Sequence, residues 1–110
     1  MEDQELYTGF IRLHILHHAS KGPIFGLWII EELARHGYKL SPGTIYPMLH
    51  GMEQKGYLTS GQEMHEGRKR RVYRIAPAGE RVLKNALAKV RELFGELFEG
   101  EAPDSLPGSQ

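Results

Sequence analysis

The 110-residue chain contains no cysteine, which excludes disulfides, thiolate zinc sites, iron–sulfur clusters and a cysteine nucleophile. The same absence is consistent with a reducing cytoplasm. No apolar run approaches the roughly 20 residues of a membrane-spanning helix. The first ten residues are acidic and polar, unlike a secretory signal peptide. We therefore expect a cytoplasmic protein with no membrane partner.

The sequence also lacks the motifs of the common enzyme classes. None of its five serines lies in a nucleophile elbow, and it has no phosphate-binding loop, no HExxH motif and no paired carboxylates in an apolar setting. Its length fits one domain and leaves no room for a Rossmann pair or a TIM barrel. We expect a protein that is not an enzyme and needs no cofactor.

The net charge is zero, but the charged side chains are unevenly distributed along the chain. Residues 35–75 carry eight basic and three acidic side chains. Residues 1–34 carry two basic and five acidic ones, and residues 76–110 carry four and six. A basic middle between acidic ends predicts a surface that binds a polyanion.

Apolar spacing predicts three helices near the N-terminus, over residues 4–19, 24–36 and 42–55. Gly37 and Gly56 follow the second and third helices, at the position where glycine commonly ends a helix.

The start of the third helix is marked by its sequence. Ser41 is a candidate N-cap, and Pro42 follows at N1, where proline is favoured. Pro47 lies beyond the first turn, so it should cost one hydrogen bond and bend the axis. We expect a distorted or partly 3₁₀ opening of this helix.

After residue 56 the apolar period changes to two. This predicts strands over residues 57–65 and 70–76, joined by a turn over residues 66–69 that supplies its own glycine. Pro77 then opens a final helix that reaches about residue 98. A hairpin with a basic tip, placed after three short helices, is the layout of a winged helix-turn-helix.

The predicted fold is therefore mainly α with a small β-hairpin. We expect a winged helix-turn-helix domain over residues 1–76, a C-terminal dimerisation helix over residues 77–99 and a disordered tail over residues 100–110.

Four segments resemble the PadR family of bacterial transcriptional regulators. They are GPIFG at residues 22–26, LSPGTIYPML at 40–49, EQKGYL at 53–58, and GRKRRVYRI at 67–75 with Ala78-Gly79-Glu80 after it. The second segment, at the start of the predicted recognition helix, is the most diagnostic. The chain departs from the family at Lys69, Val72 and Ala76, where proline, tyrosine and threonine are frequent.

The resemblance implies a homodimer that represses transcription and that a small molecule or another signal releases from its operator. A single helix after the hairpin resembles the short branch of the family. The rival hypothesis is a winged-helix module that binds protein without binding DNA. It keeps the fold but leaves the arginine-rich hairpin without a purpose.

Six residues at the start of the third helix are candidates for contact with double-stranded DNA. They are Ser41, Gly43, Thr44, Tyr46, Pro47 and His50. Short polar groups at a helix N-terminus suit base edges in the major groove and phosphate oxygens, and glycine permits close approach. Alternatively, Ser41 is only a cap and Tyr46 only packs in the core.

The hairpin carries the strongest concentration of positive charge. Its candidate DNA-binding residues are Arg68, Lys69, Arg70 and Arg71. They suit phosphates, and Arg68 at the tip also suits a narrow minor groove. A merely solvated hairpin is the alternative. Lys39, Lys55 and Arg74 are weaker candidates.

Two apolar stripes are candidates for a homodimer interface. The final helix carries Leu83, Leu87, Val90, Phe94 and Leu97 at coiled-coil spacing, and the first helix adds Leu6, Phe10 and Leu13. Two copies with recognition helices about 34 Å apart would read a palindromic operator. Packing of both stripes within one chain is the alternative.

Aromatic and histidine residues raise two further questions. Candidates for a hydrophobic effector site are Phe10, His17, Trp28 and Phe94, although such residues are more often core. His14, His17 and His18 have a spacing that suits a borderline metal. Without a cysteine or an obvious carboxylate partner, ordinary packing or surface histidines are the favoured interpretation, and no metal is assigned.

Overall fold

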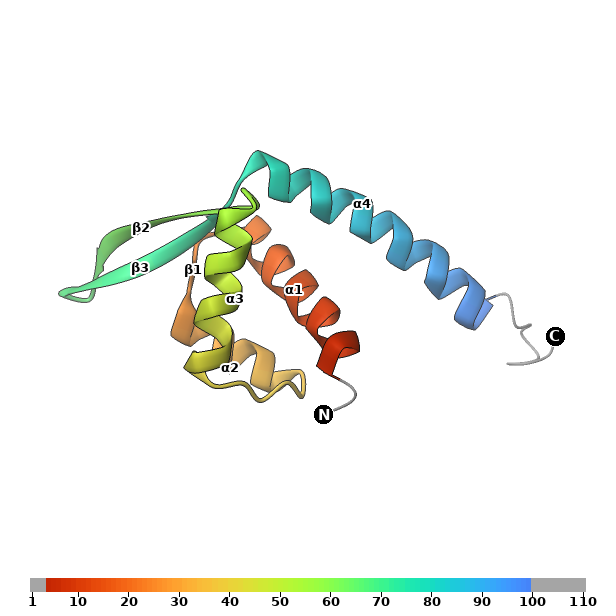
Figure 1. Cartoon of the computed structure of the whole chain (residues 1–110), viewed down its shortest axis with the longest axis horizontal. Helices are drawn as coiled ribbons and strands as arrows, with labels where there is room; N and C mark the ends of the chain where they lie inside the picture. The colour runs from red at the N-terminus through yellow and green to blue at the C-terminus, as the bar shows by residue number, and fades with distance from the viewer. Residues whose placement is uncertain (1–3, 100–110) are drawn as a thin grey trace.

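The computed structural model describes residues 4–99, which form helices at both ends and a small sheet between them (Figure 1). The elements are α1 (Gln4–Lys21), β1 (Ile24–Phe25), α2 (Gly26–Arg35), α3 (Pro42–Gln54), β2 (Leu58–His65), β3 (Arg68–Ile75), α4 (Pro77–Phe94) and a π-helical turn, η1 (Gly95–Glu99). The mainly helical fold with a hairpin is confirmed. The tail expected over residues 100–110 lies outside the described residues.

The core lies where α1, α2 and α3 meet one face of the sheet. The side chains that are almost completely buried come from each of these elements, and they include Ile15, Ile29, Leu33, Ile45, Leu49 and Leu58. Each such side chain contributes about 1.5–3 kcal/mol relative to an exposed position. The apolar stripes of the first three helices are thus the internal surfaces of this domain.

The glycines at the helix ends adopt the backbone conformation that the sequence predicted. Gly37 has φ +94° and Gly56 has φ +83°. After α2, the N–H of Gly37 donates to the Ala34 carbonyl at 3.0 Å, and that of Tyr38 donates to the Leu33 carbonyl at 2.9 Å. This pair of bonds is a Schellman motif, and the same pattern follows α3. Both glycines therefore terminate helices.

The start of α2 differs from the sequence prediction. Ile24 and Phe25 were expected in the helix, but they form the two-residue strand β1, which pairs antiparallel with Tyr73 and Val72 of β3. The sheet order is β1-β3-β2. A strand of two residues forms only because it pairs with β3. The spacing of apolar residues in the sequence therefore does not reveal it.

The turn of the hairpin is shorter than predicted. Glu66 and Gly67 alone form it, with φ +53° and +78°, and His65 pairs directly with Arg68. Positive φ at both central residues is typical of a type I′ turn. Arg68 and Lys69 were expected in the turn and instead begin β3. The β2–β3 hairpin, called the wing below, projects from the body of the molecule (Figure 1).

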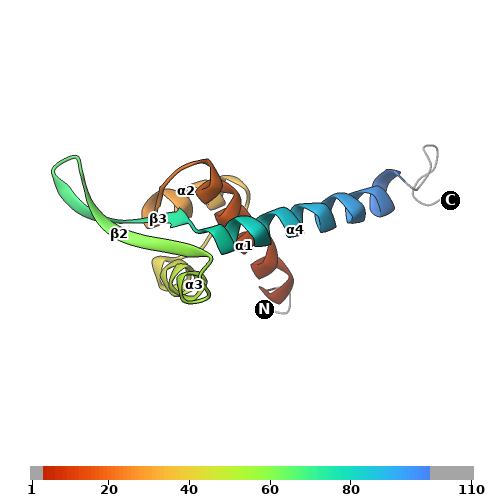
Figure 2. The ribbon, with the colours of Figure 1, turned by 90° about the horizontal axis from the view of Figure 1, so that it is seen from above.

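Helix α4 contacts the core at its N-terminal end and extends away from it towards its C-terminal end. Leu83 is buried against the core, whereas the C-terminal half of α4 extends away on the side opposite the wing (Figure 2). The predicted α-helix to residue 98 is correct only to Phe94, because the chain then widens into the π-helical turn η1. No helix within residues 4–99 has the length and apolarity needed to cross a membrane.

Candidate nucleic-acid interface

The recognition helix α3 is held by three buried side chains and exposes the rest of its N-terminal half. Ile45, Leu49 and Met52 are buried in the core. The predicted DNA-binding residues on this helix are all exposed: Ser41, Gly43, Thr44, Tyr46, Pro47 and His50. One face of α3 is thereby fixed to the body, and the opposite face is free for a ligand.

The first turn of α3 presents hydroxyl groups to solvent. Ser41 is the N-cap residue and Pro42 occupies N1, as predicted, but the Ser41 side chain makes no capping hydrogen bond. Its Oγ lies 3.4 Å from Oγ1 of Thr44. The Ser41 carbonyl accepts the N–H groups of both Thr44 and Ile45 at 3.0 Å, so one bond of 3₁₀ type opens an otherwise α-helical segment. This bond confirms the predicted partly 3₁₀ opening of the helix.

Tyr46 has a structural role as well as an exposed edge. Its ring lies so close to Gly26, the first residue of α2, that a Cβ at Gly26 would overlap the ring and hydroxyl. About a third of the Tyr46 surface, 37 %, remains exposed. The two alternatives for this residue are therefore combined: the ring packs between α2 and α3, and its edge borders the exposed face of α3.

The basic residues of the wing lie on two faces of the hairpin instead of crowding one turn. Side chains alternate along β3, so Lys69 and Arg71 share the face of Tyr73, which is turned towards α3. Arg68 and Arg70 share the other face. The sequence treated these four as one cluster, and only the register separates them.

Arg70 and Arg74 have partners within the chain. The Arg70 guanidinium lies 5.9 Å from the centre of the Phe25 ring, and its Nε is buried without a hydrogen bond among the described residues. Arg74 donates to the Glu63 carboxylate at 2.7 Å. Lys69 and Arg68 remain exposed at the outer half of the wing. They are the basic residues most accessible to a polyanion.

A chain of hydrogen bonds joins the end of α3 to the wing. Arg71 Nη1 donates to Ser60 Oγ at 2.8 Å, and Ser60 Oγ donates to Glu53 Oε2 at 2.8 Å. These residues come from β3, β2 and α3. Glu53 and Arg71 also line a groove of about 680 Å³ between helix and wing, together with Tyr46, His50, Gln54 and Tyr73. Sequence analysis missed Glu53 and Ser60, because their role depends on the strand register.

A family model described as "Transcriptional regulator PadR-like family" matches residues 15–85, which include α2, α3 and the wing. The chain belongs to the PadR-like family. The resemblance identified from the sequence is thereby confirmed. PadR-family regulators bind DNA and are not enzymes, so the non-enzymatic role is confirmed as well.

Relatives of this PadR-family chain span most of its length. It is 46 % identical over 99 residues to "Transcriptional regulator Rv3488" of Mycobacterium tuberculosis, covering 90 % of this chain and 92 % of that protein. Among solved structures, a PadR family transcriptional regulator from Eggerthella lenta has a TM-score of 0.71 and 29 % identity over 82 % of this chain and 80 % of its own. Putative transcriptional regulator TA0346 from Thermoplasma acidophilum has a TM-score of 0.69 and 29 % identity over 84 % and 94 %.

The two apolar stripes of this PadR-family chain divide between core and surface. Leu83, predicted at the dimer interface, is only 7 % exposed and packs in the core of its own chain, and Leu13 is half-buried against the same core. Both residues hold α4 and α1 together. The remaining candidates are exposed: Leu6, Phe10, Leu87, Val90, Phe94 and Leu97. Leu93 and Phe98 add to this surface.

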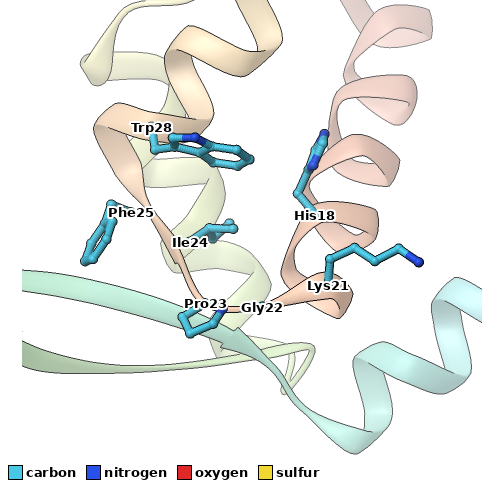
Figure 3. Close-up of a pocket in the computed structure, with 7 residues that line it drawn as sticks. All are labelled: His18, Lys21, Gly22, Pro23, Ile24, Phe25 and Trp28. Carbon is cyan, nitrogen blue, oxygen red and sulfur yellow. The ribbon is translucent and has the colours of Figure 1, made fainter.

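The four residues predicted for an effector site do not converge. Phe10 and His17 line one pocket with Leu87 of α4. Trp28 lies elsewhere, where its indole faces His18 across a pocket between the end of α1 and the start of α2 (Figure 3). Phe94 packs against Phe98 at the end of α4. Only Phe10 and His17 belong to a common pocket.

Proposed function

We propose that this PadR-family regulator is a homodimeric, sequence-specific repressor that acts on a palindromic operator in the cytoplasm. The observation that carries the proposal is the common surface of α3 and the wing. The exposed polar half of the recognition helix adjoins a basic hairpin, and the bonds through Ser60 join the two. A major groove and its flanking phosphates require this pairing of features.

In this proposal the N-terminal half of α3 enters the major groove. Gly43 has no side chain to hold the backbone away from the bases, and the hydroxyls of Ser41 and Thr44 are close enough to act together. Tyr46 and His50 follow on the exposed face of the helix. Hydroxyls and imidazoles are donors and acceptors that read base edges.

The wing supplies contacts to the DNA backbone. Lys69 and Arg71 lie on the face turned towards α3, so they reach phosphates beside the groove that α3 occupies. Arg68 adjoins the two-residue tip and is placed to follow the backbone or to enter the adjacent minor groove. Each phosphate contact releases counterions, so binding should weaken steeply with salt.

Dimerisation supplies a second DNA-binding domain, which would bind the second half-site of the operator. The exposed apolar side chains of α4 beyond Leu83 have few partners within their own chain, and apolar surface of this extent is typical of an interaction site. A second copy of α4, packed on this stripe, would bury it. The resulting two-fold symmetry matches a palindrome.

A signal that lowers DNA affinity completes the proposed role. The pocket lined by Phe10, His17 and Leu87 lies between α1 and α4, beside the stripe assigned to the dimer. A hydrophobic small molecule bound there would touch both helices. Such a ligand could change the separation of the two recognition helices without touching DNA.

The test is selection of bound fragments from random double-stranded DNA by the purified protein. A palindrome with half-sites about one turn apart supports the proposal. Lys69→Ala should then weaken binding similarly for all sequences and reduce the salt slope by about 1. Lys89→Ala, on the exposed surface of α4, is the matched control and should leave both unchanged.

The rival function, a winged-helix module that binds protein only, makes the opposite prediction. Selection would then enrich no DNA sequence, and Lys69→Ala would change no DNA affinity at low salt. Either result overturns the repressor proposal.

A further inference from the structure

The packing of α1 against α2 brings three histidines together. His14 and His18 lie one turn apart on α1, and His36 caps the C-terminal end of α2. One imidazole nitrogen from each histidine lies within 4.8 Å of the corresponding nitrogens of the other two. His36 is distant in sequence from the other two, so only the packing of α1 against α2 brings it to them.

A carboxylate also points into this cluster. Glu32 Oε2 lies 3.2 Å from His36 Nε2 and 3.6 Å from His18 Nε2. The other oxygen, Oε1, is occupied by Arg35 at 3.2 Å. The Glu32 side chain is 12 % exposed, so its position is fixed by this packing. The carboxylate partner that the sequence lacked is therefore present.

We propose that His14, His18, His36 and Glu32 form a binding site for one divalent transition-metal ion of the zinc class. The site would join α1 to α2. This assignment replaces the sequence interpretation of His14 and His18 as ordinary packing or surface histidines, because two of the four ligands come from α2.

The geometry suits a tetrahedral ion. Ligands bound at about 2.0–2.1 Å in a tetrahedral site are separated from one another by about 3.4 Å. The distances from Glu32 Oε2 to the imidazoles of His36 and His18, 3.2 and 3.6 Å, are close to this value, and the histidine nitrogens, within 4.8 Å of one another, would have to move closer together. Three imidazoles and one carboxylate are donors that zinc, cobalt and nickel accept, whereas magnesium and calcium prefer oxygen alone.

The four proposed ligands form two pairs, and each pair has the spacing of about one helical turn. His14 and His18 are an i,i+4 pair on α1, and Glu32 of α2 forms an i,i+4 pair with His36 at the C-cap of that helix. Residues with this spacing lie on one face of a helix, as in the paired histidines of known zinc sites. The two pairs face each other, so the ion would close a bridge between the helices.

The two α1 histidines of this cluster lose their protons more readily than a free imidazole does, which suits metal binding at neutral pH. Burial, together with the neighbouring His36 and His18, lowers the pKa of His14. Burial is also the largest cause of the lowered pKa of His18. Neutral imidazoles offer the lone pair that a metal needs. Three imidazoles this close would repel one another if all were charged.

The test uses untagged, full-length protein, stripped of metal by a chelator and titrated with Zn²⁺ alone in a calorimeter. We expect one ion per chain and a higher midpoint of thermal unfolding, because the ion binds only the folded arrangement. His18→Ala and His36→Ala should each weaken binding about tenfold or more. Glu32→Gln should weaken it while keeping a similar shape.

His17→Ala is the matched control, since His17 is an exposed neighbour on α1 outside the cluster. It should bind Zn²⁺ as the wild type does. Co²⁺ in place of Zn²⁺ should give the visible absorption of a tetrahedral site, and His36→Ala should abolish that absorption. The proposal is overturned by no saturable binding, by normal binding in His36→Ala, or by equal loss in His17→Ala. The test needs no DNA, so its failure leaves the repressor proposal intact.

Discussion

Gly26 shows how a single residue sets the position of the recognition helix. It is the first residue of α2, and the ring of Tyr46 on α3 occupies the space where any other residue would have a side chain. The contact lets α2 and α3 approach closely at this point. It also fixes Tyr46, whose exposed edge borders the proposed DNA-binding surface.

We predict that Gly26→Ala destabilises the fold by about 1–3 kcal/mol, the usual cost of overpacking a site that can partly adjust. Tyr46 is partly exposed, so its ring can swing outward and limit the loss. Urea unfolding measures the effect. Gly51→Ala in α3 is the control: nothing lies near the new methyl group, and alanine should stabilise the helix by up to about 1 kcal/mol. Equal stability of the two variants would contradict the role given to Gly26.

Residue types along the chain identified most of the exposed residues of the proposed DNA-binding surface but not their grouping. Ser41, Thr44 and His50 were recognisable because a capped helix start has a local signature. Lys69 and Arg70 point to opposite faces, and this depends on the length of the turn. Glu-Gly is a less typical two-residue turn than Asn-Gly, so a longer one was expected.

At the scale of elements, the wing is positioned by the bonds from Ser60 to Glu53 and Arg71. The hairpin is otherwise exposed beyond its inner end, and a two-stranded hairpin alone is marginally stable. The Ser60 hydroxyl therefore links β2 to α3 through Glu53 and to β3 through Arg71. It holds the wing at a fixed angle to α3.

We predict that Ser60→Ala lowers DNA affinity without removing a charge, so the salt slope stays unchanged while binding weakens. The stability loss should be about 0.5–1.5 kcal/mol, the net value of a typical hydrogen bond. Fluorescence anisotropy gives the affinity, and hydrogen exchange of β2 and β3 amides reports the looser wing. Thr59→Ala, on the opposite face of β2, should change neither quantity. If Thr59→Ala lowered DNA affinity as much as Ser60→Ala does, the link between Ser60 and α3 would not explain the effect.

Elements were predictable from the sequence where their signals are local. The bounds of α1 and α3 follow from apolar spacing and end signals, and both helix-ending glycines were found. The strand β1 was missed because two residues become a strand only by pairing with β3. The four-residue cluster around Glu32 was missed for the same reason, since it depends on how α1 packs against α2.

At the scale of the whole molecule, one helix serves two purposes along its length. The first turns of α4 are anchored by Leu83 in the core, and the later turns carry apolar side chains outward. The sequence presented this stripe as one continuous seam. The structure divides it, because α1 covers only the part of α4 nearest the core, around Leu83.

We predict that Val90→Asp converts the protein to a monomer that remains folded. Val90 lies in the middle of the exposed part of the stripe and is 43 % exposed, so a charge there disrupts contacts between copies and not the core. Sedimentation equilibrium at micromolar concentration gives the oligomeric state, and circular dichroism checks the fold. Lys89→Asp introduces the same side chain one position away, off the stripe, and should stay dimeric. A dimeric Val90→Asp variant would exclude this face as the interface.

Val90→Asp also distinguishes the DNA affinity of a single half-site from that of two half-sites bound by one dimer. A dimer binds both half-sites in one event, so loss of dimerisation should reduce operator affinity to that measured on a single half-site. Wild-type affinity should fall when about five base pairs, half a turn, are inserted between the half-sites, and should partly recover with about ten. Val90→Asp should be insensitive to both insertions. If the wild type were equally insensitive, each winged-helix domain would be binding independently, and α4 would have another role.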